Sequence, residues 1–315
     1  MSHDEFTVGI ICALPLEVAA AVTMLDEEYK TMPAQDPADH NTYRFGRLHL
    51  HKVVIASLPS GLSGTTSAAT VAKDMLRTFQ SLRVRLMVGI GGAAPVPDSE
   101  ERDIRLGDVV ISKPSGNFGG LVQFDNGKHT QADGLIRKGT LPPPPFSLLT
   151  ALSKLESDLE LGESTIPANL ATAFQRGPTV AKRFGHPGLV NDVLYEPDYV
   201  HPTSAATCAG CDVSRHILRE ERDSTEPVIY CGNIASSNAV MKNARLRDQL
   251  RQEFDVMCFE MEAAGLVDFP CLVIRGISDY SDSHKNDRWQ RYAAATAAAC
   301  AKSLLGGCSQ AVSPS

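Results

Sequence analysis

Three acidic residues stand at places in the chain where chemistry is often done. Glu17, Glu262 and Asp279 each lie just beyond, or at the end of, an apolar run that predicts a buried strand. Ligands of open α/β sheets bind at the carboxyl ends of the strands, so side chains from separate strands can meet there. Each acid alone also has an ordinary structural interpretation, as a first-turn helix acid, the start of a helix, or a helix cap or turn.

The elements that must position these acids alternate between strand and helix at both ends of the chain. This alternation predicts an α/β fold, a single doubly wound domain whose mixed central sheet is flanked by helices. The expected strands are Phe6–Cys12, two runs within Tyr43–Leu58 that meet near Gly46, Arg85–Ile90, Asp108–Lys113, Val228–Gly232, Val256–Met261 and Cys271–Ile277, and the expected helices are Leu16–Leu25, Ser63–Phe79, Phe146–Leu155, Ala239–Phe254 and Asp287–Leu305.

The middle of the chain is less regular. Pro142–Pro145 is a break of four prolines, and Gly177–Thr225 is polar and interrupted by glycine and proline. We interpret the second segment as an inserted loop region within one catalytic domain that covers residues 1–305. The small residues of Gly306–Ser315 predict a flexible tail, or the start of a linker.

The composition narrows the class of protein. Of the 315 residues 43% are hydrophobic and 21% are charged, which is typical of a globular protein with one large core. The formal net charge of −7 argues against a nucleic-acid-binding protein, which would carry a basic face. The start of the chain is polar and acidic rather than signal-like, and the apolar runs are too short for a membrane span, so we expect a cytoplasmic protein with reduced core cysteines.

Four motifs, in order along the chain, resemble one known family. Phe259–Ala264 (FEMEAA) followed by Val273–Asp279 (VIRGISD) is similar to the signature of the nucleoside phosphorylase and nucleosidase superfamily. Val8–Val18 resembles the opening strand and glutamate of its nucleosidase branch, and Gly89–Ala93 with Leu106–Ser112 resembles its central region. The resemblance covers about Val8–Lys113 and Val228–Leu305, and the stretch between is most similar to nucleosidase-like domains of fungal proteins.

The resemblance implies a catalytic role for three residues. Cleavage of an N-glycosidic bond passes through a cationic sugar, so the leaving base must be neutralised. By resemblance, Asp279 is the acid that protonates purine N7, Glu17 is the base that activates water, and Arg275 holds the water and the glutamates.

The resemblance also implies the residues that bind substrate. Glu262 is expected to accept hydrogen bonds from the ribose hydroxyls, and Met261 to pack against the sugar. Gly92 of the central strand is also expected to contact the substrate. Gly232, Asn233, Ala235 and Ser236 are expected to lie along the purine and to offer backbone groups to its edge.

The sequence favours water over phosphate as the nucleophile. Phosphorylases of this family hold phosphate with arginines and a serine around the central strand, where this chain has Met87 and Ile90, and it has Leu16-Glu17 in place of Asp-Arg. A phosphate site without its arginines lacks charge-assisted hydrogen bonds. Ile90 also replaces a serine that contacts water in the nucleosidases. Ala235 stands where the family has an aromatic residue that forms one wall of the purine pocket. Phe118 and Phe124 are the candidates to stack on the purine instead.

These observations predict a purine nucleoside N-ribohydrolase acting on inosine, guanosine or adenosine, with no cofactor and, by family resemblance, a homodimer. The alternative enzyme acts on purine nucleotides such as ATP, with Lys285, Arg288 or Arg291 against the phosphates. Phosphorolysis comes third. A non-catalytic ligand-binding module is the alternative from another class, since the fungal look-alikes are parts of larger signalling proteins.

Two weaker patterns remain. His201, Cys208, Cys211 and His216 combine a Cys-x2-Cys pair with two flanking histidines, which could hold a structural zinc ion in the inserted loop. The interpretation that we favour at this point is a reduced cysteine pair with two solvated histidines, so we assign no metal. Ser115–Gly120 is rich in glycine but lacks the ending of a phosphate-binding loop, and indicates a flexible turn.

Overall fold

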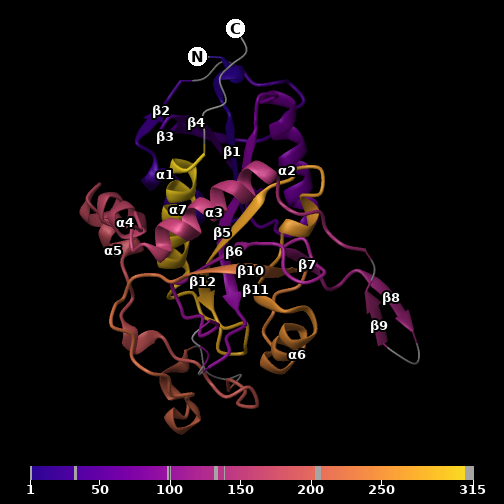
Figure 1. The fold of residues 1–315 in the computed structure, drawn as a ribbon, viewed down its shortest axis with the longest axis vertical. Helices are drawn as coiled ribbons and strands as arrows, with labels where there is room; N and C mark the ends of the chain where they lie inside the picture. Colours follow the sequence, from indigo (N-terminus) through magenta and orange to yellow (C-terminus); the bar gives the residue numbers. More distant parts are fainter. Residues whose placement is uncertain are drawn as a thin grey trace.

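The computed structural model describes residues 2–31, 34–97, 99, 101–130, 134–137, 139–202 and 207–308. The described residues form one mixed sheet with helices on both faces, and a small hairpin, β8–β9, stands away from the body (Figure 1). The strands are β1 (Val8–Cys12), β2 (Glu27–Tyr29), β3 (Tyr43–Leu48), β4 (His51–Ser57), β5 (Val84–Ala93), β6 (Val109–Ser112), β7 (Leu121–Gln123), β8 (Gly127–Thr130), β9 (Gly134–Arg137), β10 (Ile229–Ser236), β11 (Val256–Glu260) and β12 (Leu272–Asp279). The α-helices are α1 (Pro15–Met24), α2 (Thr65–Thr78), α3 (Phe146–Glu160), α4 (Ile166–Phe174), α5 (Pro178–Phe184), α6 (Ala244–Phe254) and α7 (Gln290–Gly306).

The order of the strands brings four strand ends to one place. The main sheet runs β11-β10-β6-β12-β5-β1-β4-β3-β2, and β7 pairs with β10. β1, β5 and β12 are parallel neighbours, so their carboxyl ends share one edge. The end of β5 also pairs with β11, antiparallel, with Phe259 opposite Gly92. The pairings from β5 through β12, β6, β10 and β11 therefore close into a ring, which carries the end of β11 to the same edge.

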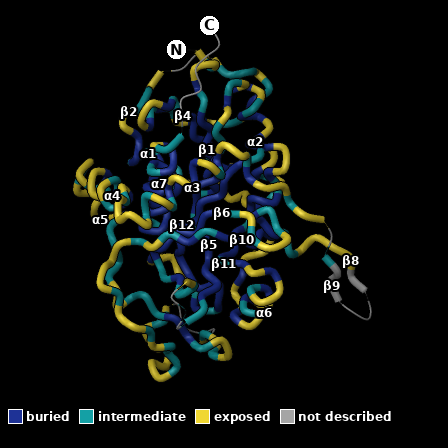
Figure 2. The backbone as a smooth tube through the Cα atoms, in the orientation of Figure 1, coloured by how far each residue is buried: buried dark blue, intermediate teal, exposed yellow. Residues whose placement is uncertain are grey.

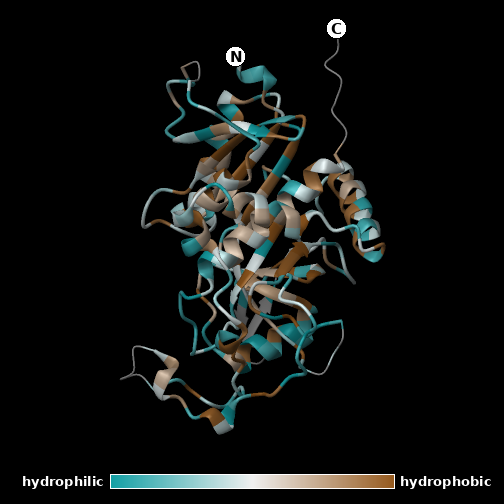
Figure 3. Ribbon diagram, turned by 90° about the vertical axis from the view of Figure 1, so that its left-hand side faces the viewer, coloured by the Kyte–Doolittle hydropathy of each residue, from teal (hydrophilic) through white to brown (hydrophobic). Residues whose placement is uncertain are grey.

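Two apolar cores lie on opposite faces of the sheet. Val8 and Ile10 of β1 pack toward α1, α3, α4 and α7, whereas Ile11, the next residue, packs toward α2. This alternation follows from the pleat of a strand, and it explains why β1 reads as a continuous apolar run. The central strands are buried and largely hydrophobic, and exposed residues gather in the outer loops (Figures 2 and 3). The alanine-rich helix α7 lies close over Gly276 of β12, where a side chain would meet the backbone of Ala293.

The fold expected from the sequence is confirmed, with local differences. The turn between β3 and β4 falls at His49-Leu50 and not near Gly46. Gly46 lies inside β3, where a Cβ atom would stand 2.7 Å from Leu25 Cδ1, so this glycine permits close packing instead of a turn. Helix α6 begins at Ala244 and not at Ala239, because the Asn243 side chain caps it by accepting a hydrogen bond from the Leu246 N–H at 3.1 Å.

Several elements were not expected from the sequence. They are β2, β7, the β8–β9 hairpin, α4 and α5, all of them short. The expected helix at Phe146–Leu155 extends further, to Glu160, as α3. Residues 309–315, most of the expected tail, lie outside the described residues. No helix in the described ranges is long and apolar enough to cross a membrane.

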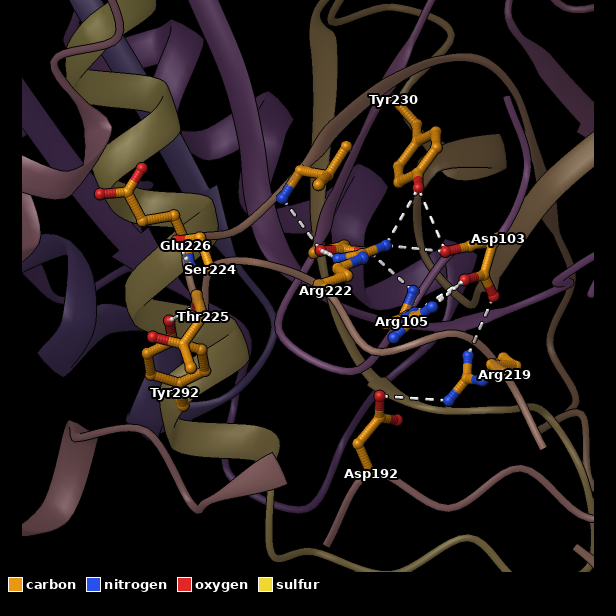
Figure 4. Close-up of polar contacts among 12 residues, drawn as sticks. Asp103, Arg105, Asp192, Arg219, Arg222, Ser224, Thr225, Glu226, Tyr230 and Tyr292 are labelled. Atoms are coloured by element: carbon orange, nitrogen blue, oxygen red, sulfur yellow. Dashed lines mark hydrogen bonds and ion pairs between the residues drawn. The ribbon is translucent and has the colours of Figure 1, made fainter. Parts of the chain in front are cut away.

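The segment Gly177–Thr225 contains α5 and several short 3-10 turns among its described residues. Charged side chains fasten it to the body of the protein (Figure 4). Arg222 donates to both carboxylate oxygens of Asp108, at 2.7 and 2.8 Å. Arg219 donates to Asp103 at 3.3 Å and to the hydroxyl of Tyr280 at 2.8 Å. Tyr280 directly follows Asp279, so this network connects the insertion to the end of β12.

We expect Arg222→Ala to lower the free energy of unfolding by about 3 kcal/mol, because it leaves the Asp108 carboxylate buried without its cation. Arg215→Ala is the matched control, since Arg215 lies in the same insertion but pairs with the more exposed Glu196 and Asp198. Urea unfolding followed by circular dichroism measures both. Equal, small losses in the two variants would contradict a structural role for the Arg222–Asp108 pair.

Candidate active site

A cavity of about 200 Å³ opens where β1, β5, β12 and β11 end. Its lining combines acidic, hydroxyl and apolar side chains with a single cation among the described residues. The lining residues are Ala13, Leu14, Glu17, Ser63, Ile90, Gly91, Gly92, Ala239, Val240, Met241, Phe259, Glu260, Met261, Glu262, Ser278, Asp279, Ser281, Lys285 and Gln290. The structure therefore brings together the three acids that the sequence singled out, along with Met261 and Gly92.

Glu17 lies in the first turn of α1 and is almost fully buried. Its Oε2 accepts hydrogen bonds from the backbone N–H groups of Ala13 and Leu14, at 2.7 and 2.8 Å, and its Oε1 accepts one from Ile90, at 2.8 Å. Burial raises the pKa of Glu17, and the nearby Arg275 and these N–H donors oppose that rise. The carboxylate is thus rigidly held, and its raised pKa suits a general base.

Arg275 is fully buried beneath the cavity, and Glu260 is its principal partner. The guanidinium makes a close ion pair with Glu260 and lies 3.6 Å from the Glu262 carboxylate. Gly89 leaves room for this group, since a Cβ there would stand 2.5 Å from Arg275 Nη1 and 2.6 Å from Glu17 Oε1. Arg275 is therefore engaged by carboxylates of the protein.

Glu260 is the site residue that reasoning from the sequence missed. It also accepts hydrogen bonds from the backbone N–H groups of Glu262 and Ala263, both at 3.0 Å, which shapes the turn that carries Glu262. A signal was present, because two glutamates separated by one residue at a strand end point to the same side. The assigned role of Arg275, bridging the glutamates, thus involves Glu260 first.

Glu262 is 5% exposed, at the turn after β11, and faces the cavity. One of its oxygens accepts a 3.3 Å hydrogen bond from the Gly64 N–H, at the start of α2. Burial, together with the negative charges of Glu260 and Glu17, raises the pKa of Glu262 to about 7 despite Arg275. This carboxyl group therefore titrates near neutral pH.

Asp279 ends β12 and is 4% exposed. Its Oδ1 accepts from the Ser281 N–H and its Oδ2 from the Ser278 hydroxyl, each at 2.9 Å. Lys285 makes a close ion pair with Oδ2. Gly92 lies opposite Asp279 in the sheet, and a Cβ there would stand 2.5 Å from Asp279 Oδ1, so only glycine fits. Gly92 thus acts by making space.

The apolar lining of the cavity includes Ala239, Val240, Met241 and Phe259, besides Ala13, Leu14, Ile90 and Met261. Phe259 supplies an aromatic face, and Phe124 packs edge-on behind it, with ring centroids 5.8 Å apart. Phe118 packs edge-on against Phe254. Phe118 and Phe124 were expected as possible aromatic walls of the purine pocket, but neither is among the described lining residues. Phe259 is the aromatic residue in that lining.

The residues that were expected along the purine belong to β10 and do not line the cavity. Gly232, Asn233, Ala235 and Ser236 are absent from the described lining. The Asn233 amide donates to the Phe254 carbonyl at 3.2 Å, and the Ser236 hydroxyl accepts from the Ala264 N–H at 3.0 Å. Strands β6, β7 and β11 flank β10 and take up its backbone groups. The segment after β10, from Ala239 to Met241, reaches the cavity instead.

Of the three cations considered for phosphate, only Lys285 lines the cavity among the described residues. Arg288 contacts Asn191, on the insertion. Arg291 belongs to α7 and is not among the described lining residues. Lys285 itself is paired with Asp279, so the described lining contains no unpaired cation.

Fold and cavity together define an α/β protein with a small-molecule site in which buried acids from separate strands converge. The chain belongs to the phosphorylase superfamily, whose family model matches residues 7–306. It is 44% identical over 306 residues to a nucleotide-binding leucine-rich repeat (NLR)-like protein of Hyaloscypha variabilis, covering 97% of this chain but 30% of that protein. The chain thus spans about a third of the length of this relative.

Two further relatives carry the names of nucleosidases. The chain is 26% identical to a 5'-methylthioadenosine/S-adenosylhomocysteine nucleosidase of Mycobacterium bovis, over 95% of each protein. It is 24% identical to the ATP nucleosidase Cap17 of Escherichia coli, over 93% of this chain and 49% of that protein. Among solved structures, the futalosine hydrolase of Helicobacter pylori superposes with a TM-score of 0.61 at 17% identity, over 97% of this chain and 99% of that one.

Proposed function

We propose that this chain hydrolyses the N-glycosidic bond of a purine nucleoside to give the free base and ribose. The observation that carries the proposal is the convergence of Glu17, Glu262 and Asp279 on one cavity, each nearly buried. Sugar cleavage needs an acid for the leaving group, a base for water, and negative charge near the developing cation. The three carboxyl groups match these needs, and the nucleosidase relatives support the assignment.

In the proposed reaction, the bond between C1′ of ribose and N9 of the purine breaks as purine N7 gains a proton from the Asp279 side. The attacking water forms the new bond to C1′ and loses a proton to Glu17. The Glu262 carboxylate accepts hydrogen bonds from the ribose hydroxyls, which strengthen as the sugar becomes cationic. Phe259 and Met241 provide apolar surface for the base.

Lys285 alters how the acid works. Its ammonium group makes an ion pair with the Asp279 carboxylate. The transferable proton then resides on Lys285 and reaches N7 through the Asp279 carboxyl. After the reaction, the proton taken up by Glu17 returns to solvent and Lys285 is reprotonated. We therefore treat Asp279 and Lys285 as one proton-donating pair.

Water is favoured over phosphate as the nucleophile because the cavity is poor in cations. Met87 is completely buried in the core, and Ile90 presents an apolar side chain to the cavity. Arg275 already forms an ion pair with Glu260. A phosphate ion next to Glu17 and Glu262 would meet negative charge without a bidentate partner.

A purine nucleotide such as ATP is the second candidate substrate. Lys285 lines the cavity, and Ser63 lies there just before α2, whose N-terminus favours negative charge. The relative named ATP nucleosidase supports this candidate. Engagement of Lys285 by Asp279 counts against it.

The deciding assay incubates the protein with inosine, adenosine, guanosine, ATP and uridine, with and without phosphate, and quantifies free base and sugar product. We expect base and ribose from a purine nucleoside at a rate independent of phosphate. An Asp279→Asn preparation, purified identically, controls for nucleosidases of the expression host. Ribose-1-phosphate formed only with phosphate would overturn hydrolysis, base release from ATP alone would promote the nucleotide candidate, and binding without base release would support a non-catalytic module.

The pH dependence of kcat/KM should reflect Glu262. Its carboxyl group is protonated below its pKa of about 7, and the protonated form is a poorer acceptor for the ribose hydroxyls. The rate should therefore fall as the pH drops through 7, by about tenfold per unit. Glu262→Gln should lower the rate and remove this acid limb. A limb that is unchanged in the variant would assign it to another group.

The homodimer stays a prediction from family resemblance, and the expectation that no cofactor is needed also stays a prediction. Sedimentation equilibrium of the purified chain measures its mass in solution. A strict monomer with full activity would count against the dimer.

A further inference from the structure

A second cluster of chemically capable side chains lies outside the cavity, in the insertion. The ligand atoms of His201, Cys208 and Cys211 all lie within 4.8 Å of one another. Cys208 and Cys211 flank a 3-10 turn in which the Cys211 N–H donates to the Cys208 carbonyl at 3.1 Å. This turn brings both thiols to one side, and Cys-x2-Cys is the usual spacing for two zinc ligands.

Two further histidines beside this cluster have unsatisfied ring nitrogens. His284 is 6% exposed, and neither its Nδ1 nor its Nε2 has a hydrogen-bond partner. Nε2 of His216 is likewise buried without a partner. A buried polar atom left without a partner costs about 1–3 kcal/mol, so such atoms call for an explanation such as a bound ion.

Aromatic packing connects these two histidines to Tyr195 and to His201 of the cluster. The rings of His284 and Tyr195 are stacked with centroids 3.8 Å apart, and the His201 ring stands edge-on to His284 at 5.3 Å. His216 packs edge-on against Tyr195 at 4.8 Å. His284 Nδ1 lies 3.9 Å from Asp282 Oδ1, too far for a hydrogen bond, so the nitrogen stays without a partner.

We propose that His201, Cys208 and Cys211 bind a zinc ion, and that a neighbouring histidine, His216 or His284, supplies the fourth ligand. Two thiolates with two imidazoles form a tetrahedral set that zinc prefers, at about 2.3 Å from sulfur and 2.0 Å from nitrogen. Protein side chains fill all four coordination positions of the ion in this arrangement. No position is left for water or substrate, so the ion is structural. The solvated-histidine interpretation favoured from the sequence does not account for the unpartnered nitrogens.

The proposed ion has a defined mechanical role. The His201 N–H donates to the Ser283 hydroxyl at 2.9 Å, and the Cys208 thiol donates to the His284 carbonyl at 3.7 Å. The cluster therefore contacts the segment that runs from Asp279 to Lys285. A metal there fastens the insertion to that segment and limits how far Lys285 can move from Asp279.

The test measures metal content and does not depend on activity. Protein produced without a histidine tag should contain about one zinc ion per chain, measured by inductively coupled plasma mass spectrometry. Cys208→Ser and Cys211→Ser should lose most of it. Cys308→Ser is the matched control, because Cys308 is a partly buried thiol at the end of α7, and it should retain the zinc.

A second measurement covers variants that fail to fold. Metal-free wild-type protein titrated with Co²⁺ should develop thiolate-to-cobalt charge-transfer absorption and the visible bands of tetrahedral cobalt, displaced by one equivalent of zinc. Chelation should also speed proteolysis within 177–225. The proposal is overturned if reduced wild-type protein neither contains nor takes up either metal, or if Cys208 and Cys211 form a disulfide. Full zinc retention after joint replacement of His216 and His284 by asparagine would overturn the histidine as fourth ligand.

Discussion

Replacing Asp279 by asparagine is expected to lower kcat by at least about 10²-fold, the usual contribution of a general acid. The asparagine oxygen can still accept the Ser281 N–H, and the Ser278 hydroxyl can turn to accept from the new amide, since it already lies 3.3 Å from the Gly91 carbonyl. The amide nitrogen, which takes the place of Oδ2, cannot accept from Lys285, so the proton-donating pair is broken while the shape of the site is kept. Single-turnover measurements at saturating substrate isolate this chemical step.

The control for Asp279→Asn is Asp287→Asn, in the same segment but exposed and absent from the described lining. It should retain the wild-type rate. Substrate binding by Asp279→Asn should weaken far less than its turnover, because protonation of N7 is needed only as the bond breaks. If both Asp279→Asn and Glu262→Gln turned over at near-normal rates, the active site would be wrongly assigned.

Glu17→Gln should lower kcat by about 10²- to 10⁴-fold, since the amide cannot take a proton from water. It should also destabilise the protein. Both oxygens of Glu17 accept backbone N–H groups, so an amide nitrogen in either position faces a donor and leaves at least one buried N–H unsatisfied. That mismatch costs about 1–3 kcal/mol.

Thermal unfolding and turnover of Glu17→Gln must be measured together for this reason. The expected combination is a lower Tm with residual activity that does not recover at temperatures well below that Tm. Glu163→Gln, an exposed glutamate outside the described lining, is the control and should change neither quantity. Normal turnover in a destabilised Glu17→Gln variant would show that Glu17 is structural and that another group activates the water.

The local sequence determined the element types and where the acids lie along the strands. Short, continuous apolar runs mark β1, β5 and β12, and parallel strands share an edge, so Glu17 and Asp279 could be expected together. The FEMEAA and VIRGISD motifs assigned roles by resemblance. The element types depend mainly on neighbouring residues, which is why the sequence is sufficient for them, whereas the roles taken from the resemblance stay predictions.

Contacts between distant segments were decided by the tertiary structure. The antiparallel pairing of β11 with the end of β5 brings Glu262 to the cavity. The packing of the core places Arg275 in an ion pair with Glu260. On β10, neighbouring strands occupy the backbone that was expected to face the purine. A strand's sequence shows that residues alternate between two faces, but not what covers each face.

The same limit applies to Lys285 and to the cysteine–histidine cluster. The sequence places Lys285 six residues after Asp279, where it was considered as a contact for phosphate. Only the path of the segment after β12 turns its ammonium group onto the aspartate. Likewise, His284 lies far along the chain from Cys211, and only the folding of the insertion against that segment brings their surroundings together. Pairings that close long loops depend on the global packing of the chain, and no local pattern encodes them.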